Sequence, residues 1–320
     1  GHGLLPAAIV AGADQGPVSG GWQRASGAGR ADGGAVGHAG GSADSGRHGF
    51  DQHVPPGGYR WWYADGTSDC GQFAFTVIAF IGSVFSPYYH WSGRGEPENH
   101  VAFNVALYGP DGNSWAMTER GRAALSRSAD RLQIGRSSLT LEAGALHIDF
   151  DEVFLPWPGQ RLLPKRMRGQ MVLTSRFSAG QVFPLDSDAR HHWSPLMPSA
   201  RVEVTSDAFA DEGWSGEGYH DSNWGDHPLE RDFVGWDWAR GAAPDGGAVL
   251  AYDAVLVGGG SKRLGLRFSG DGGVQHFGLP ERKILPPGFW GVGGGVASGS
   301  FAAPRLLRRL EDSPFYRRSL

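Results

Sequence analysis

The sequence has one cysteine, no excess of positive charge and no long hydrophobic run. Cys70 stands alone among 320 residues, which excludes an internal disulfide and a zinc site built from several thiolates, and fits a reducing compartment. The formal net charge of −4 gives no electrostatic reason to expect a nucleic-acid partner. The most apolar stretch, residues 73–89, is interrupted by Gly82, Ser83 and Pro87 and falls short of the roughly 18 apolar residues of a membrane span.

Glycine and tryptophan are abundant instead. The chain has 52 Gly and 12 Trp, and 40% of its residues are hydrophobic whereas 19% are charged. This composition is typical of a β-rich protein with many turns and a sizeable core. The length of 320 residues fits one large domain or two of ordinary size.

Residues 1–50 differ from the rest of the chain. They are rich in Gly, Ala and Ser and have no apolar periodicity, so they bury too little surface to offset the entropy of ordering. We predict that this segment is disordered and that the folded part begins near Asp51.

From residue 51 onward, short runs of β-forming residues alternate with turn residues. Residues 100–107 and 114–119 flank the turn sequence GPDGN and predict a β-hairpin, whereas helix signals are weak and confined to 118–128. Further strands are predicted at 73–81, 139–142, 145–150, 168–173, 201–205, 233–238, 248–256 and 263–268. We therefore expect an all-β fold of antiparallel barrels or sandwiches, dividing near residue 185 into units 51–185 and 186–320.

The segment 213–230 has the sequence GWSGEGYHDSNWGDHPLE, the most informative pattern in the chain. On a strand, Tyr219, Asp221 and Asn223 share one face. A buried Asp is costly unless it is paired or protonated, and a neutral buried Asp is what an unactivated substrate needs as a proton donor. The pattern therefore indicates a general acid; the alternative is a structural Asp that accepts hydrogen bonds from turn amides.

A second candidate lies in ARHHWSP at 189–195, which we predict to be a loop. A histidine here would orient an acid or handle a water proton. The competing interpretation is a surface pair, His191 and His192, beside a core Trp193.

Other patterns are weaker, and each has an ordinary structural explanation. A metal site formed by histidines of these two segments with Asp221 lacks ligand spacing. Acidic pairs suited to glycoside hydrolysis are common by chance. A C-terminal group of arginines fits either contact with anionic lipid or a solvated face. The metal candidates are His191, His192, His220 and Asp221. The acidic pairs are Glu217 with Asp221 and Asp226 with Glu230. The C-terminal arginines are Arg305, Arg308, Arg309, Arg317 and Arg318.

Several longer motifs in one order resemble the carotenoid 1,2-hydratase family, also called hydroxyneurosporene synthases. They are PPGGYRWWYADGTSD at 55–69, AFTVIAFIGSVFSPYYHW at 74–91, NVALYG at 104–109, WAMTERG at 115–121, WSGEGYHDSNWGDHPLE at 214–230, WDWAR at 236–240 and LEDSPFYRRSL at 310–320. The resemblance covers about residues 51–320. It implies two tandem lipocalin-like antiparallel β-barrels, 51–185 and 186–320.

The same resemblance implies an enzyme that adds water to the terminal C1=C2 double bond of acyclic carotenoids such as lycopene and neurosporene, without a cofactor or metal. The family needs a His and a Trp two apart and a Tyr and an Asp two apart, which fall on His191 and Trp193 and on Tyr219 and Asp221. The related superfamily includes pericyclase-type enzymes that share part of the Tyr219–Asp221 pattern, so a relative with other chemistry stays an alternative.

A carotenoid is long, apolar and dissolved in the bilayer, so the resemblance implies peripheral membrane contact by a cytoplasmic protein at the inner, photosynthetic membrane. Its end group would be bound by aromatic side chains, for most of which ordinary core packing is the alternative: Trp61, Trp62, Phe85, Tyr88, Tyr89 and Trp224. Two further alternatives are a non-catalytic lipocalin-like carrier of isoprenoids and a carbohydrate-active β protein.

Overall fold

The computed structural model describes residues 9–14, 49–156, 162–177, 179–209, 213–287, 293–298, 306–312 and 316–319. Strands dominate these ranges, which confirms the predicted all-β fold. The helical elements among them are short: α1 (Pro87–Trp91), α2 (Leu229–Asp232) and the 3₁₀ turns Pro97–Asn99 and Arg122–Ala124. None of these helices has the length and apolar character needed to cross a bilayer.

One large antiparallel sheet takes up most of the described chain. Its strand order is β5-β4-β3-β2-β13-β12-β10-β9-β8-β7-β6, and β11 pairs with β12 beside this path. The strands are β2 (Tyr59–Ser68), β3 (Ala74–Ile81), β4 (Val101–Gly109), β5 (Gly112–Arg120), β6 (Leu125–Arg127), β7 (Arg131–Ile134), β8 (Ser137–Glu142), β9 (Ala145–Phe154), β10 (Lys165–Ser175), β11 (Phe183–Pro184), β12 (His191–Ser206) and β13 (Gly213–Gly225). The predicted hairpin is confirmed as β4 and β5.

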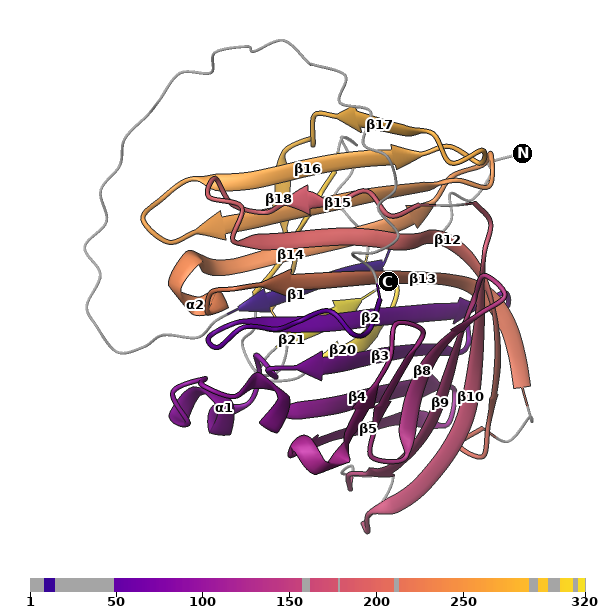
Figure 1. Ribbon diagram of the computed structural model, residues 1–320. Coiled ribbons are helices and arrows are strands. Elements are labelled where there is room, and N and C mark those ends of the chain that lie inside the picture. Colours follow the sequence, from indigo (N-terminus) through magenta and orange to yellow (C-terminus); the bar gives the residue numbers. More distant parts are fainter. Residues whose placement is uncertain are drawn as a thin grey trace.

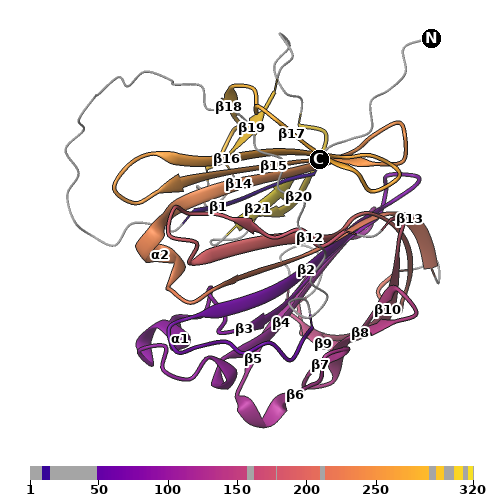
Figure 2. The same cartoon turned by 45° about the horizontal axis from the view of Figure 1, so that its top comes forward.

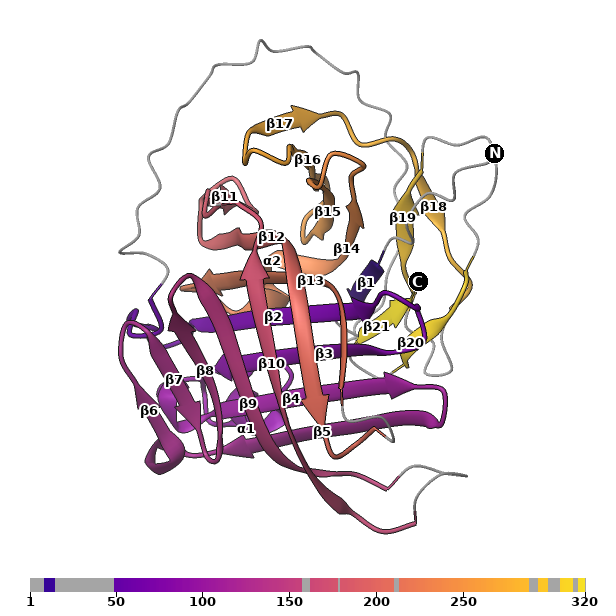
Figure 3. The same ribbon diagram turned by 90° about the vertical axis from the view of Figure 1, so that its right-hand side faces the viewer.

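This large sheet curls back on itself, and strands β6 to β10 cross over β2 to β5 (Figure 3). Just after β9, the backbone N–H of Leu155 donates to the carbonyl oxygen of Trp115 on β5 at 2.9 Å. Alternate residues of β9, among them Leu146, Ile148 and Phe150, are buried, as expected for a strand with one face on a core. The curl therefore encloses the first hydrophobic core.

A second antiparallel sheet has the order β17-β16-β15-β14-β1-β21-β20, and its central strands lie alongside β12, β13 and β2 (Figures 1 and 2). Its strands are β1 (Ile9–Asp14), β14 (Phe233–Ala242), β15 (Ala248–Leu256), β16 (Ser261–Phe268), β17 (Val274–Phe277), β20 (Arg309–Asp312) and β21 (Tyr316–Ser319). A separate pair is formed by β18 (Arg282–Ile284) and β19 (Gly295–Ala297).

A second hydrophobic core joins the two sheets. It combines outward-facing residues of β2, β12 and β13, such as Tyr63 and Tyr219, with residues of β14 and β15, such as Trp238 and Leu250. Because side chains alternate between the two faces of a strand, each of β2, β12 and β13 contributes one face to the first core and the other face to this inter-sheet core.

The predicted disordered segment, residues 1–50, lies mostly outside the described residues; within it, Ile9–Asp14 forms β1 between β14 and β21. The predicted division near residue 185 is not marked by the hydrogen bonding. Strands β12 and β13 follow residue 185 but pair with β10 and β2, and the chain changes sheets between β13 and β14. Two folding units, 51–185 and 186–320, stay a prediction.

The expected loop at 189–195 is wrong for most of its length, because β12 begins at His191. Proline cannot donate to a strand ladder, and its presence made this segment look like a turn. The register shifts between Pro195 and Met197 and again between Met197 and Ala200, and such irregularities let a strand continue past prolines.

Both expectations for the C-terminal arginines are wrong for Arg318. Its side chain is fully buried, and Nη2 lies 3.4 Å from Oδ2 of Asp65. A buried guanidinium needs a charged partner, so Arg318 belongs to the interior of the molecule rather than to a lipid-facing or solvated surface. Arg305 and the side chain of Arg317 lie outside the described part of the chain.

Candidate active site

The candidate residues line one face of three neighbouring strands. Strand β13 runs between β12 and β2, and its Asp221 stands opposite Pro195 on one side and Tyr63 on the other. Residues two apart on a strand share a face. Four predicted site residues therefore lie on the face that points into the inter-sheet core: His191, Trp193, Tyr219 and Asp221.

Asp221 is the centre of this face. Tyr219 Oη donates to Asp221 Oδ2 at 2.8 Å, and the indole Nε1–H of Trp193 donates to the same oxygen at 2.9 Å. All three side chains are buried, Asp221 with 4% exposure. The rings around them include Trp238, whose centroid lies 4.8 Å from that of Tyr219, and Tyr252, at 5.2 Å from Trp193.

Burial raises the pKa of Asp221 to about 7, against the opposing effect of its hydrogen bonds from Trp193 and Tyr219; the negative charge of Asp65 adds to the rise. Burial likewise raises the pKa of Tyr219 well above 10, with a further contribution from Asp221. The carboxyl is therefore neutral in a large part of the molecules near neutral pH, while the phenol keeps its proton.

Three buried polar atoms between the two sheets have no hydrogen-bond partner in the described structure: Oδ1 of Asp221 and Nδ2 of Asn223 on β13, and Nε1 of Trp238 on β14. A buried polar group that stays unpaired costs about 1–3 kcal/mol. Buried polar groups of this kind indicate a polar ligand such as water or a hydroxyl. The site therefore combines an apolar wall with a few free polar atoms, as small-molecule sites do.

Behind the site lies a buried ionic network that the sequence did not reveal. Arg240 on β14 donates to Oδ1 of Asp65 through Nε at 2.9 Å, and Tyr63 Oη donates to Oδ2 at 2.7 Å. Arg318 approaches the same carboxylate. The Arg240 guanidinium also lies 5.7 Å from the ring centroid of Tyr219. These bonds fix the two tyrosines on either side of Asp221.

His191 lies on the same face but its ring bonds elsewhere. Nδ1 is 3.0 Å from Tyr59 Oη, and Nε2 is 2.8 Å from Oδ2 of Asp232. His227 Nδ1 is bonded to the same oxygen of Asp232. Burial raises the pKa of Asp232, but the hydrogen bonds from His191 and His227 outweigh it and leave the pKa below its usual value.

The weak metal candidate considered from the sequence is not brought together. His192 and His220 alternate with Trp193 and Asp221 along their strands and so face away from them; the His192 ring stacks on Trp224 instead. In the described chain, a different set converges within 4.8 Å: His191, His227 and Asp232. Both imidazoles meet one carboxylate oxygen at hydrogen-bond distance, which matches a proton-linked network better than a set spread around an ion.

The predicted substrate-binding aromatics separate into different places. Trp61 faces the inter-sheet core and stacks on Tyr59 at 5.0 Å. Trp62 and Trp224 face the other side, where the guanidinium of Arg60 lies between their rings at 5.3 and 4.6 Å. Of these three, only Trp61 shares the face of Asp221.

The other predicted aromatics come from β3's C-terminal side and α1. Phe85 packs on Phe80, a member of the inter-sheet core. Tyr89 is buried, and its hydroxyl donates to the carbonyl oxygen of Gly58 at 2.6 Å, as expected for a structural residue. Tyr88 is 63% exposed and contacts the equally exposed Trp91.

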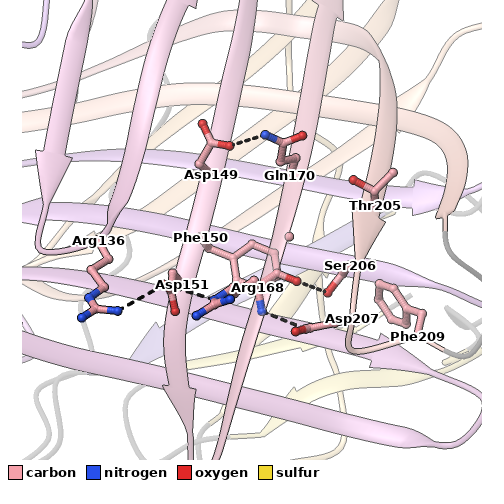
Figure 4. A pocket seen from close by; sticks show the side chains of 11 residues that line it. Arg136, Asp149, Phe150, Asp151, Arg168, Gln170, Thr205, Ser206, Asp207 and Phe209 are labelled. Carbon is pink, nitrogen blue, oxygen red and sulfur yellow. Dashed lines mark hydrogen bonds and ion pairs between the residues drawn. The ribbon is translucent and has the colours of Figure 1, made fainter.

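A hollow of about 630 Å³ lies over β9, β10 and the end of β12 (Figure 4). Its lining is polar and ion-paired: Arg168 Nε lies 3.3 Å from Oδ2 of Asp151, and Gln170 donates to Asp149 at 2.6 Å. It includes none of the residues around Asp221, and a charged lining does not suit a hydrocarbon.

The comparison with known proteins decides the family. Residues 77–320 match the family described as Carotenoid hydratase CrtC. The chain belongs to this carotenoid hydratase family. It is 45% identical over 323 residues to the acyclic carotenoid 1,2-hydratase of Thiocapsa roseopersicina, covering 100% of this chain and 78% of that protein.

A second relative is the acyclic carotenoid 1,2-hydratase of Rubrivivax gelatinosus. It is 43% identical to this chain over 276 residues, which cover 85% of this chain and 66% of that protein. Among solved structures, kievitone hydratase from Nectria haematococca has a TM-score of 0.47 at 12% identity, covering 74% of this chain and 69% of that chain. The sequence relatives confirm the family resemblance; the structural likeness is too distant to bear on the site.

The motifs of the carotenoid hydratase family include Trp193, Tyr219 and Asp221, which the structure brings together, but sequence reasoning missed Tyr59, Asp65 and Asp232. Tyr59 and Asp65 lie inside the quoted motif 55–69, at odd positions with Trp61 and Tyr63. That spacing of two was the available signal, because it puts them on the face that meets Asp221 once β2 pairs with β13.

Proposed function

We propose that this protein hydrates the terminal C1=C2 double bond of acyclic carotenoids such as lycopene and neurosporene, giving 1-hydroxy carotenoids. The observation that carries the proposal is the buried Asp221, whose pKa lies near 7 and whose Oδ1 has no partner within the described structure. A trisubstituted alkene is a weak base, so it needs a neutral acid held against it in a dry site. Membership of the carotenoid hydratase family supports this choice of substrate.

In this mechanism, Asp221 gives its proton to C2, which leaves a tertiary cation at C1 and an Asp221 carboxylate. The hydrogen bonds from Trp193 and Tyr219 stabilise the carboxylate as it forms. The π faces of Trp193 and Tyr219 stabilise the cation, each by roughly 0.5–2 kcal/mol. Water then forms the C1–O bond, and one of its protons leaves, so that the sum is alkene plus water giving a tertiary alcohol.

The amide of Asn223 and the indole of Trp238 have roles in the proposal as well. Asn223 offers an unpaired amide NH2 and Trp238 an unpaired indole N–H between the two sheets. We assign them to the attacking water and to the product hydroxyl, because a polar atom on an otherwise apolar wall fixes where such a ligand sits. Trp61, on the same face, is the predicted aromatic that contacts the end group of the substrate.

The proposal includes peripheral contact with a membrane, because the substrate is dissolved in the bilayer. Helix α1 supports this with two neighbouring aromatics, Tyr88 and Trp91, that are 63% and 73% exposed. Tyr and Trp are the residues that membrane interfaces favour. We therefore assign the lipid-facing part of the surface to α1.

The test is incubation of the purified protein in detergent or lipid with lycopene and, separately, neurosporene, in water enriched in heavy oxygen, followed by mass spectrometry. The expected product is a 1-hydroxy carotenoid that carries one heavy oxygen per hydrated end. Tight binding of carotenoid without product would replace the proposal by a non-catalytic carrier. Neither binding nor product from folded protein would indicate a relative with other chemistry.

A further inference from the structure

We infer that Tyr59, His191 and Asp232 form a proton relay in which Tyr59 takes the proton from the attacking water, His191 accepts the proton of Tyr59, and Asp232 is the positioning residue for His191. This inference rests on the proposed hydration and concerns its second half, the attack of water on C1. The relay is assigned from hydrogen bonds, strand register and burial.

The hydrogen bonds define which nitrogen of His191 is the acceptor. Asp232 has a pKa below its usual value and is therefore an anion that accepts, so the Nε2–H of His191 donates to it at 2.8 Å. In a neutral imidazole the other nitrogen then carries the lone pair. Nδ1 therefore accepts from the hydroxyl of Tyr59 at 3.0 Å. Base, orienting carboxylate and hydroxyl follow the same logic as a catalytic triad.

Strand register places this relay on the same face of the sheet as the acid, but four residues further along β13. Tyr59 and His191 stand opposite Gly225 from its two sides, and Gly225 is four residues after Asp221 on β13. Four strand residues span about 13 Å, with Asn223 midway. The unpaired Nδ2 of Asn223 is placed to hold water between the acid and the relay.

Gly225 makes the contact between Tyr59 and His191 possible. A Cβ at this position would lie 2.7 Å from Nδ1 of His191 and 2.9 Å from Cε1 of Tyr59. Both distances are well inside van der Waals contact, so any side chain here separates the two groups. The absence of a side chain at residue 225 is therefore a condition of the hydrogen bond between Tyr59 and His191.

The far end of the relay reaches solvent. His227 shares the Asp232 oxygen and lines a hollow of about 460 Å³ together with Asp226 and Arg231. Tyr59 and His191 are buried, whereas His227 and Asp232 are half-buried. The positive charge that develops on His191 therefore faces the polar, partly exposed end of the relay, away from the apolar wall around Trp193.

The proton balance closes over one turnover. Water bonds to C1 and passes one proton to Tyr59 as the Tyr59 proton moves to His191 Nδ1, which gives an imidazolium next to the Asp232 anion. After the product leaves, the Nδ1 proton returns through Tyr59 and an entering water to the Asp221 carboxylate, which restores the Nε2–H tautomer of His191 and the neutral acid. Both groups return to their starting states, and no oxidant or reductant is consumed.

The first experiment compares Asp232→Asn with Asp226→Asn. Asparagine keeps the shape of Asp232 but can donate to Nε2, which favours the tautomer with a proton on Nδ1. We expect kcat to fall about 100-fold or more, within the range known for general base catalysis, with KM within about twofold of wild type. Asp226→Asn removes a carboxylate from the same hollow and is expected to keep wild-type kcat.

Nitrogen NMR of the imidazoles tests the relay in the resting protein, without catalytic turnover. In the wild type, the His191 signals should show an unprotonated Nδ1 and a protonated Nε2, and Asp232→Asn should reverse this or mix the two. These spectra can be interpreted even if the protein does not hydrate carotenoids, so the relay and the proposed function are tested separately. A protonated Nδ1 in the wild type would overturn the relay, as would one equivalent of tightly bound Zn²⁺ in the purified protein.

Tyr59→Phe removes one hydroxyl and keeps the ring that stacks on Trp61. It is expected to lower kcat about as much as Asp232→Asn, and the double variant should be no slower than either single one, because residues that act as a unit are not additive. Wild-type kcat in a folded Tyr59→Phe protein would overturn the assignment of Tyr59. This variant also keeps the inference testable if Asp232→Asn does not fold.

Discussion

Trp193 donates its indole N–H to the same Asp221 oxygen that accepts the hydroxyl of Tyr219, at 2.9 and 2.8 Å. Both donors favour the ionised carboxylate, whereas burial favours the neutral acid, and burial is the larger effect on the pKa. Oδ2 of this carboxyl therefore accepts two hydrogen bonds, whereas Oδ1 has no partner in the described structure. Such a group can release a proton from Oδ1 while Oδ2 is already stabilised for the charge that follows.

Asp221→Asn is expected to abolish hydration while keeping the fold. The amide has the shape of the carboxyl and its oxygen accepts the bonds from Trp193 and Tyr219, but it has no acidic proton. Loss of a general acid costs about 10²–10⁴-fold, so we expect less than about 1% of wild-type product in the heavy-oxygen assay. Circular dichroism and the melting temperature are the controls, and substantial activity in a folded variant would remove Asp221 from the proton-transfer step.

The pH dependence follows from the raised pKa of Asp221. Because only the neutral acid donates, kcat/KM is expected to fall about tenfold per unit above about pH 7. A profile that keeps rising to pH 9 would contradict a neutral Asp221 as the donor. The measurement is the initial rate of product formation at fixed ionic strength across pH 5–9.

Stability should depend on pH through the same group. The pKa of Asp221 is higher in the folded protein, about 7, than the roughly 3.9 of an unfolded chain. Its contribution to the free energy of unfolding is therefore full below about pH 4 and is lost as pH rises through 7. Urea unfolding at pH 5 and pH 8.5 should show Asp221→Asn gaining stability relative to wild type at the higher pH, and parallel shifts at both values would contradict this.

The contact between Tyr219 and Asp221 was predictable because it is local in sequence. Tyr219 and Asp221 are two apart, so a strand alone puts them on one face. The same rule separates Trp61 from Trp62, so the two side chains cannot both contact the end group of one substrate on a single face of β2. Adjacent strand residues point to opposite sides, and the structure places one in the inter-sheet core and the other in the enclosed core.

The partners of the site were not predictable because they come from distant segments. Asp65 and Arg240 are 175 residues apart, and they meet only because β2 and β14 belong to sheets that pack face to face. The sheet pairing itself, with β12 and β13 between β10 and β2, depends on tertiary packing that no local pattern records. Alternation of apolar residues and β propensity indicate that a segment is a strand, whereas the packing of the whole core determines which strands pair with it.

Asp65→Asn is expected to destabilise the protein strongly. It leaves the buried Arg240 and Arg318 guanidinium groups without their carboxylate, and breaking a buried pair costs about 3–5 kcal/mol. Asp69→Asn is the matched control, because Asp69 pairs with Arg201 at the surface and an exposed pair contributes about 0–1 kcal/mol. Equal free energies of unfolding for the two variants in urea would show that the buried network does not hold the sheets together.

The double variant Tyr88→Ser with Trp91→Ser is expected to weaken binding to lipid vesicles. Both side chains are exposed on α1, and their removal takes away interfacial aromatics without opening a core. Ile284→Ser is the control, since Ile284 is similarly exposed, at 71%, but lies on β18. Vesicle sedimentation measures the bound fraction, and unchanged sedimentation of the double variant would place membrane contact elsewhere. Activity in detergent should stay near wild type in both variants.

Gly225→Ala tests whether the contact over β13 matters for the reaction. The added methyl would meet His191 Nδ1 at 2.7 Å and Tyr59 Cε1 and the Arg190 carbonyl oxygen at 2.9 Å each, so either the strand or the two side chains must shift. Overpacking of this kind costs about 1–3 kcal/mol, and a misplacement of about 1 Å at a reacting group costs on the order of 10²-fold in rate. We therefore expect a lower melting temperature together with a fall in kcat. Gly278→Ala is the control, because a Cβ there meets nothing within 4 Å and both quantities should stay at wild-type values. A variant at residue 225 that loses stability but keeps kcat at temperatures where it is folded would separate the Tyr59–His191 contact from catalysis.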